Sequence, residues 1–381
     1  ALRRRGTNGA VLLLHPGSLA LLHRHGVANA VVDRGWRVRS IRVYRDAECV
    51  GELSLEKVAR RSRLPFDFGI SVAQADLEDC LRDALRARHV EVHDQRRLTR
   101  FEQGAARVRV TIDHLDTDSA GYAVAHSEMV VDKSEDIEPE FVLAADGHQS
   151  AMRQQLGLEF GEIGATQPFL VVEGRAPSPA PEVAVLSFDA GRSSSLWPLV
   201  GGRQHAVFGV QSADLEALGL HDAHHHPGAR LRIDAERLSA WVAARTRWQA
   251  SGWNELEARG PFHADPRLAS GFGRGRVWLA GAAAHWASPL TSLSTNVGLS
   301  EAAQLADIFA AAKGRETPLD ALASYERESL ERWRRLLDAD PVRLDPFPPS
   351  AAGGAMAASE PAARDFDALL AGLTSTRQSA A

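Results

Sequence analysis

The sequence predicts a mixed α/β (α+β) protein in which a helix-rich α/β part is interleaved with a sheet-rich part. The apolar run from Val277 becomes a small-residue turn at Gly281 and then an Ala-rich amphipathic segment from Asn296, typical of strand, tight turn and helix. A second apolar run, residues 140–145, also ends in a turn and opens a helix. Between these two junctions, residues 162–261 become strand-like runs separated by Pro and Gly turns.

The first half of the chain alternates between helical and strand periodicities. An apolar run precedes a helix that starts near Pro16 and is stopped by Gly26. The spacing of Leu77, Leu81 and Leu85 predicts an amphipathic helix over residues 74–88. Alternating apolar residues predict four strands, the last three as an antiparallel ribbon, at residues 37–44, 90–93, 107–112 and 122–131.

The second half returns to the α/β pattern after the sheet-rich segment. Residues 275–281 form a buried strand, a helix follows up to Ala312, and residues 319–337 form a charged amphipathic helix. From Asp338 the chain is rich in Pro, Ala, Gly and Ser, which predicts a flexible tail over residues 339–381.

Composition excludes several classes of protein. With 381 residues, 44% hydrophobic and 24% charged, the chain is long enough for a sizeable core. A net charge of −5 gives no support for nucleic acid as a partner. No apolar run is long enough to span a membrane. Two cysteines, Cys49 and Cys80, support neither a disulfide framework nor a metal cluster, which favours a cytoplasmic protein. Composition leaves the oligomeric state undetermined.

Two segments rich in His or Arg could bind a ligand by composition. The histidines at positions 221 and 224–226 could bind a metal by composition, but without a second group of ligands a solvated loop is the preferred interpretation, and no metal is predicted. Arg3, Arg4 and Arg5 could meet a phosphate, but an exposed terminal charge run is the preferred interpretation.

The turn after residue 280 carries the most specific signal. Gly281-Ala282-Ala283-Ala284-His285, followed by Pro289 and by Thr295-Asn296, closely resembles the second flavin-binding motif of the single-component aromatic hydroxylases, the family of para-hydroxybenzoate hydroxylase (PHBH). In that family an Asp at the position of Ala282 holds the ribityl chain of FAD. The resemblance implies a PHBH-like FAD-binding fold, a class A flavoprotein monooxygenase, and cofactor contacts from Gly281, Ala282, Pro289, Thr295 and Asn296.

A second motif, about 130 residues earlier, resembles the same family in the same order. Asp146-Gly147, with Ser150 and Arg153 at the matching offsets, is similar to the Asp-Gly motif that lies near FAD and the passing nicotinamide cofactor. Taken alone, Asp-Gly after a strand is an ordinary turn. Gln74 matches a Gln that contacts the flavin, and it can equally be a polar residue at a helix start.

The family's Gly-rich strand–loop–helix, which holds the FAD pyrophosphate, has no counterpart in this sequence. We therefore expect either that the natural gene product extends N-terminally or that the pyrophosphate cradle has been lost. The predicted domains are an FAD-binding domain incomplete at its N-terminus (1–161), a substrate-binding sheet domain (162–261), a second part of the FAD-binding domain (262–338) and the tail.

The resemblance implies an FAD-dependent monooxygenase that hydroxylates an aromatic or polyketide-like molecule with NAD(P)H and O₂. The cofactor performs this chemistry, so no catalytic side chain is named. His285 as a general base is the less favoured alternative to a structural role. Trp197 is predicted to line the substrate pocket, with a core position as the alternative. Ala282 and the missing Gly-rich loop keep a flavin-free homologue, binding a small molecule or partner without redox chemistry, as the second hypothesis.

Overall fold

A computed structural model of the chain describes residues 10–118, 128–163, 168–176, 182–189, 192–220, 229–247, 252–312 and 319–338. The predicted tail, the histidine-rich stretch and Arg3–Arg5 lie outside these ranges. Among the described residues, no helix is both long and apolar enough to cross a membrane. No group of three potential metal ligands occurs in the same ranges.

The N-terminal layer is a small sheet covered by helices. Strand β1 (Val11–Leu14) pairs antiparallel with β5 (Gly69–Ala73), which also pairs with β2 (Trp36–Val38). Leu14 and Ile70 pack with the apolar faces of α1 (Pro16–Arg24), α2 (Ala28–Arg34) and α4 (Gln74–Arg86). The predicted helix start at Pro16 and the stop at Gly26, which has φ 74°, are confirmed.

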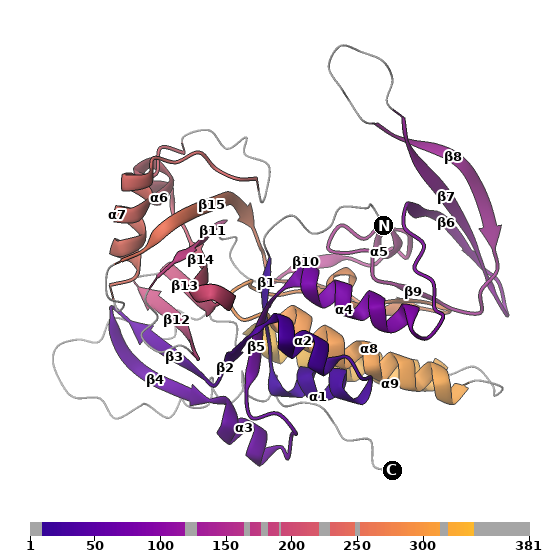
Figure 1. Ribbon diagram of the computed structural model, residues 1–381. Helices are drawn as coiled ribbons and strands as arrows, with labels where there is room; N and C mark the ends of the chain where they lie inside the picture. The colour runs from indigo at the N-terminus through magenta and orange to yellow at the C-terminus, as the bar shows by residue number, and fades with distance from the viewer. Residues whose placement is uncertain are drawn as a thin grey trace.

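A seven-stranded sheet forms the left-hand body of the molecule in Figure 1. Its order is β15 (Asn254–His263), β11 (Pro168–Arg175), β14 (Arg203–Gly209), β13 (Arg192–Pro198), β12 (Val183–Asp189), β3 (Ser40–Arg45) and β4 (Glu48–Ser54). Five of these strands come from the segment predicted to be sheet-rich.

The other two strands, β3 and β4, show that the single strand predicted over residues 37–44 is wrong. The strand expected over residues 37–44 is divided at Arg39 between β2 and β3, which belong to different sheets. The backbone N–H of Arg39 donates to the carbonyl of Glu182, which starts the parallel pairing of β3 with β12. Residues 40–54, which lie within the predicted domain 1–161, therefore contribute two strands to the large sheet, and the domain boundaries stay predictions.

The two faces of the large sheet have different neighbours. The outer face packs against α6 (Ser212–Ala217) and α7 (Ala235–Arg245) through residues such as Phe208 and Trp241. The inner face shares one apolar cluster with Leu13 of β1, Leu55 of α3 (Leu55–Arg61) and Leu290. The inner face therefore meets the residues around the predicted cofactor turns.

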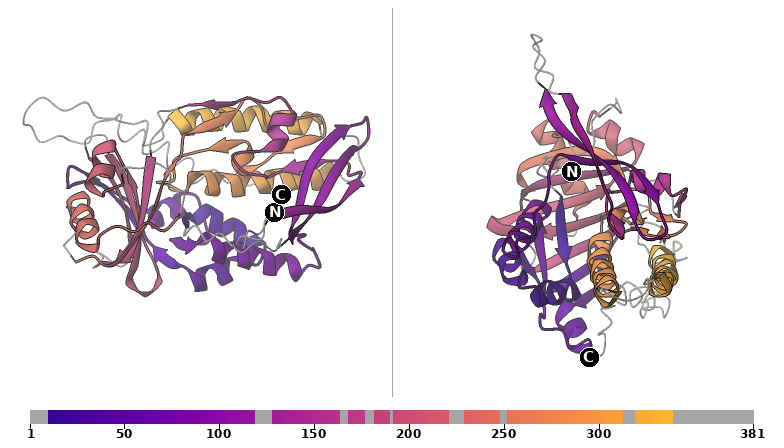
Figure 2. Two further views of the ribbon diagram at one scale, coloured as in Figure 1. Left: turned by 90° about the horizontal axis from the view of Figure 1, so that it is seen from above. Right: turned by 90° about the vertical axis from the view of Figure 1, so that its right-hand side faces the viewer.

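The C-terminal body is assembled from short strands and two long helices. Strands β9 (Val142–Ala144), β18 (Val277–Leu279) and β17 (Gly273–Arg274) form one sheet, and β10 (Phe160–Glu162), β16 (Arg267–Ala269) and β19 (His285–Trp286) form another. Helices α5 (Ala151–Gln155), α8 (Leu293–Ala312) and α9 (Leu319–Asp338) pack with them around Phe272 and Trp333. Helices α8 and α9 lie side by side (Figures 1 and 2).

A three-stranded ribbon extends from this body, at the upper right of Figure 1. It consists of β6 (Arg96–Gln103), β7 (Val108–Asp118) and β8 (Glu128–Ile137). The strand predicted over residues 90–93 is wrong, because that segment has no regular structure and exposes Val90 and Val92. Its apolar alternation lacks a strand to pair with, and β6 provides the partner of β7 instead. Of the strand predicted over residues 122–131, the part before residue 128 lies outside the described residues.

Candidate functional site

The two sequence motifs meet at the ends of two neighbouring parallel strands. Ala144 of β9 pairs with Leu279 of β18, and the N–H of Ala280 donates to the carbonyl of Ala144 at 2.8 Å. Carboxyl ends of parallel strands lie at the same edge of a sheet, where α/β proteins bind ligands. Gly147 and Gly281 therefore lie at this common edge, although 134 positions separate them in the sequence numbering.

In both turns the backbone at the glycine is accessible to a ligand. Gly147 has φ 84° and Gly281 has φ 58°, left-handed conformations that favour glycine. A Cβ atom at either position would have no neighbour within 4 Å. The absence of side chains at these points permits a ligand to approach the backbone closely.

One buried guanidinium ties the two turns together. Arg153 donates through one terminal nitrogen to the carbonyl of Ala283 and through the other to the carbonyl of His148, both at 2.8 Å. The guanidinium also lies 3.8 Å from the centre of the Phe160 ring. Burial lowers the pKa of Arg153, and the nearby Asp146 charge opposes this shift. The sequence places Arg153 at the offset that matches the Asp-Gly motif, but it does not predict that Arg153 connects the two motifs.

Asp146 and Ser150 act locally on helix α5. The Asp146 carboxylate accepts from the N–H of Met152 at 3.2 Å, and the Ser150 hydroxyl oxygen accepts from the N–H of Arg153 at 2.9 Å. Such side-chain bonds satisfy N–H groups that have no partner inside the helix. They fix the turn, while the Asp146 side chain remains exposed to solvent.

Helix α8 begins one turn earlier than predicted. The expected start was near Asn296, but the carbonyl of Ser292 already accepts from the N–H of Asn296 at 3.2 Å. Leu293 is buried, and its packing carries the helix back toward the core. The helix N-terminus therefore lies directly after the loop that contains Pro289, and Thr295 lies half-buried in its first turn.

Asn296 cross-links three segments of the chain. Its Oδ1 accepts from the N–H of His15 at 2.9 Å and from the Ser18 hydroxyl at 2.7 Å. Its Nδ2 donates to the carbonyls of Leu13 and Ser292, at 2.8 and 2.9 Å. The side-chain amide is thus fully engaged within the protein. Its assignment as a cofactor contact stays a prediction, and the roles of His15, Ser18 and Ser292 were not foreseen.

His285 belongs to a sealed cluster behind the turn. Its Nε2 lies 2.7 Å from Glu301 Oε2, and neither side chain is exposed to solvent. The imidazole stacks on Trp333 with ring centres 3.8 Å apart, and Trp333 Nε1 donates to the other Glu301 oxygen at 2.6 Å. Exclusion from solvent favours the structural interpretation of His285 over the general-base alternative.

Three further predicted site residues have the following surroundings. Ala282 lies half-buried in a short 3₁₀ turn, and its methyl group offers no hydrogen bond. Gln74 is the first residue of α4 and donates to Glu78 of the same helix at 2.7 Å. Trp197 is only 1% exposed and belongs to the inner-face cluster with Leu13 and Leu290. That burial fits the core alternative for Trp197, and its role in substrate binding stays a prediction.

The residues at this edge fit the flavin end of FAD. The open glycine positions in the two turns and the N-terminus of the 20-residue helix α8 offer backbone N–H groups to a polar, negatively polarised group. Ala282 cannot supply the carboxylate that the resemblance implies for the ribityl chain. The fit is therefore good at the ring system and weaker at the ribityl chain.

Comparison with known proteins agrees with this architecture. The profile of the FAD binding domain family matches residues 8–340. A curated relative, 6-methylpretetramide 4-monooxygenase of Streptomyces rimosus, is 26% identical over 337 residues, covering 87% of this chain and 54% of the relative. The chain thus spans about half the length of that relative.

Solved structures show the same fold at low sequence identity. p-Nitrophenol 4-monooxygenase from Pseudomonas putida superposes with a TM-score of 0.67 at 17% identity, covering 95% of this chain and 84% of that one. Aklavinone-11 hydroxylase, solved with FAD and aklavinone, superposes with a TM-score of 0.65 at 19% identity, covering 89% of this chain and 62% of that one.

The fold and the paired turns define a PHBH-like flavoprotein architecture. The chain belongs to the FAD binding domain family.

Proposed function

We propose that this chain carries an FAD-dependent monooxygenase activity that hydroxylates an aromatic or polyketide-like small molecule with NAD(P)H and O₂. The observation that carries the proposal is the meeting of the two turn motifs at one strand edge, joined by Arg153, next to the inner face of the large sheet. The relative and the structural neighbours named above, which are monooxygenases and hydroxylases, support it.

The proposed cofactor contacts come from the described turns. Asp146, Gly147, Gly281, Pro289 and Thr295 would hold FAD by backbone and short side-chain contacts, with Gln74 and Ala282 as the further predicted contacts. When bound, FAD supplies the redox chemistry with NAD(P)H and oxygen.

The rest of the chain positions and shields the cofactor. With FAD bound, the N-terminus of α8 would stabilise negative charge on the flavin ring. Asn296 and Arg153 hold the loops at the proposed site, and the inner face of the sheet would keep water away from the reacting atoms.

The test is FAD binding followed by turnover. Purified protein is titrated with FAD and its visible absorption recorded, and oxidation of NADH and NADPH is then measured with a panel of phenols and hydroxyquinones. We expect that the protein perturbs the absorption spectrum of FAD. We also expect that one nicotinamide cofactor is oxidised faster when a suitable phenol or hydroxyquinone is present. Absence of flavin binding at millimolar FAD would overturn the proposal. Recovery of both Cys49 and Cys80 as free thiols from cells would agree with the proposed cytoplasmic location.

A second function is favoured by one specific observation, the methyl group of Ala282 at the motif position of an acid. In this alternative the protein binds a small molecule or a partner without redox chemistry. The same experiment separates the two functions. The alternative predicts that a phenol or hydroxyquinone binds, while added FAD keeps the absorption spectrum of free flavin.

A further inference from the structure

A polar row crosses the inner face of the seven-stranded sheet. Trp197 of β13 pairs with His205 of β14, His205 with Glu173 of β11, and Glu173 with Glu257 of β15. Residues directly opposite each other on antiparallel strands point to the same face. Since Trp197 belongs to the inner-face cluster, the whole row faces the body that carries the cofactor turns.

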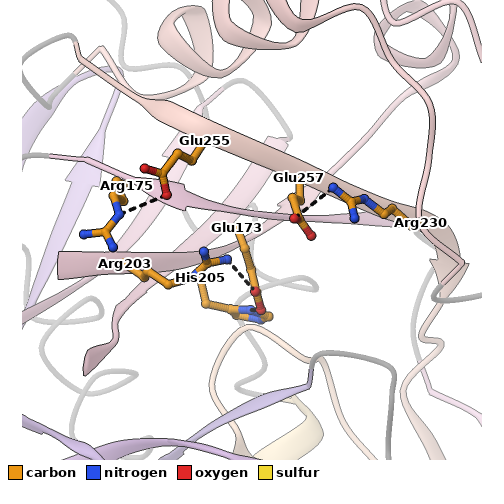
Figure 3. A network of polar contacts seen from close by, with 7 residues as sticks. All are labelled: Glu173, Arg175, Arg203, His205, Arg230, Glu255 and Glu257. Carbon is orange, nitrogen blue, oxygen red and sulfur yellow. Dashed lines mark hydrogen bonds and ion pairs between the residues drawn. The ribbon is translucent and has the colours of Figure 1, made fainter. Parts of the chain in front are cut away.

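Within this row His205 and Glu173 form a defined pair. His205 Nδ1 lies 2.9 Å from Glu173 Oε1, and Arg203 donates to the other carboxylate oxygen at 3.3 Å (Figure 3). Burial alone would raise the pKa of Glu173, but the hydrogen bonds and charges of His205 and Arg203 lower it on balance. An ionised carboxylate at Nδ1 holds the proton there and leaves Nε2 as an acceptor.

Several polar atoms on this face have unused hydrogen-bonding capacity. The His205 side chain is 3% exposed, and Nδ1 is the ring nitrogen that faces Glu173. The Trp197 indole N–H is buried without a partner. The hydroxyl of Ser195, two residues earlier on β13 and hence on the same face, is also buried without a partner. Buried polar groups in native proteins are nearly always paired, so these groups point to a missing polar ligand.

The other charged groups of the network are already paired with one another. Arg175 donates to Glu255 at 3.0 Å, and Arg230 donates to Glu257 at 2.9 Å (Figure 3). Both pairs are more exposed than His205 and Glu173. They supply matched surface controls on the same sheet.

We propose that His205 accepts the proton of a ring hydroxyl on a hydroxyquinone-type ligand, and that Glu173 is the positioning residue for His205. The O–H bond of the ligand breaks, its proton moves to Nε2, and the electron pair stays on the ring oxygen as a phenolate. The Glu173 carboxylate stabilises the resulting imidazolium. A carbonyl elsewhere on the ligand would accept from the Trp197 N–H or the Ser195 hydroxyl. The inference rests on the proposed function, because it names the substrate class of that same site.

The test uses a dye whose colour reports its own ionisation. 2-Hydroxyanthraquinone and its methyl ether, 2-methoxyanthraquinone, are titrated into the protein, with and without FAD, at a pH at which the free dye is neutral. We expect the bound hydroxy dye to show the red-shifted phenolate absorption and to bind about tenfold more tightly than the ether, roughly the effect of one charge-assisted hydrogen bond.

Two variants and one control assign the effect. His205→Gln should abolish the red shift and the preference for the hydroxy dye, and Glu173→Gln should weaken both. Neither variant should change binding of the methyl ether by more than about twofold, since a purely structural defect would weaken both dyes alike. Glu257→Gln, in the same row but paired at the surface, should behave as the parent protein. Circular dichroism checks that each variant is folded.

Distinct outcomes separate this inference from the proposed function. A red shift that persists in His205→Gln, or a parent protein that binds both dyes equally or binds neither, would overturn the role of His205. If FAD fails to bind while the red shift still depends on His205, the monooxygenase proposal falls and the hydroxyl subsite stands. If FAD binds normally and the red shift is independent of His205, only the subsite falls.

Discussion

Two histidine–glutamate pairs lie in different regions of this protein and have opposite surroundings. His285 and Glu301, 2.7 Å apart behind the cofactor turn, are both fully buried. His205 and Glu173, 2.9 Å apart on the inner face of the sheet, have side chains that are 3% and 15% exposed. Around the first pair, Trp333 covers the imidazole and donates to the carboxylate. Each pair has a buried polar atom without a partner in it or beside it, His285 Nδ1 in the first and the Trp197 indole nitrogen next to the second. The pairs therefore differ in packing and solvent exposure, because Trp333 covers His285 whereas part of Glu173 stays exposed.

The largest effect is expected from breaking the enclosed pair. Glu301→Ala leaves the Trp333 N–H and the buried imidazole without partners, and should lower the free energy of unfolding by about 3–5 kcal/mol. Urea denaturation measures this loss. Asp307→Ala, at an exposed position on the same helix, should change it by less than about 0.5 kcal/mol. Equal losses in the two variants would show that the enclosed pair contributes no special stability.

A smaller loss is expected at Asn296. Asn296→Ala removes four hydrogen bonds, and because each buried group left unpaired costs about 1–3 kcal/mol before relaxation and water entry, we expect a net loss of about 2–4 kcal/mol. Asn296→Asp keeps the acceptor for His15 and Ser18 but loses both donated bonds, so it should fall between the parent and the Ala variant. A neutral Asn296→Ala would contradict the cross-linking role.

Ala282 stands where the resemblance to the PHBH family implies an Asp. Ala282→Asp should strengthen FAD binding by about 1.5–3 kcal/mol, roughly tenfold to a hundredfold in affinity, if the carboxylate accepts a ribityl hydroxyl. FAD titration followed by flavin fluorescence measures the change, with Ala282→Asn as the neutral control. No tightening in Ala282→Asp would mean that the ribityl chain lies elsewhere.

His15 shows what burial does to a histidine without a carboxylate partner. Burial lowers its pKa from 6.5 to about 3, and its Nδ1 has no partner. Between these values the unfolded chain binds more protons, so stability is present above pH 6.5 and is lost as the pH falls toward 3. The group should lower the free energy of unfolding by about 2 kcal/mol at about pH 5 relative to about pH 8.

The variant His15→Leu should remove this component of the acid sensitivity. Denaturation midpoints across this pH range measure it, and His25→Gln, at an exposed histidine, should keep the parent profile. An unchanged pH profile in His15→Leu would show that His15 is protonated in the folded protein.

The smallest effect is expected at the open pair. Glu173→Gln should lower the free energy of unfolding at neutral pH by no more than about 1 kcal/mol, because the amide still accepts from the imidazole and solvent screens the Arg203 contact. The lowered pKa means that the Glu173 charge stabilises the fold above its ordinary value of 4.5, and that this contribution disappears as the pH falls through the lower folded value. A loss as large as that of Glu301→Ala would remove the distinction between the two pairs.

Sequence alone determined the features that depend on neighbouring residues. The apolar run that ends in the small-residue turn at Gly281, the Asp146-Gly147 turn and the start of α1 at Pro16 are local patterns of burial and backbone freedom. The resemblance of the two motifs to the PHBH family, in order and spacing, also implied the PHBH-like fold. The local predictions succeeded because turn geometry and strand burial act within a few residues.

Tertiary structure decided the features that depend on residues distant in sequence. The division at Arg39 follows from pairing with a strand near residue 183, and no periodicity within residues 37–44 reveals it. Three of the four bonds of Asn296 reach segments more than 270 positions away, and an Arg153 bond spans 130 positions. Whether a histidine–glutamate pair is enclosed or open is set by the side chains that pack around it, because desolvation and hydrogen-bond satisfaction belong to the assembled core.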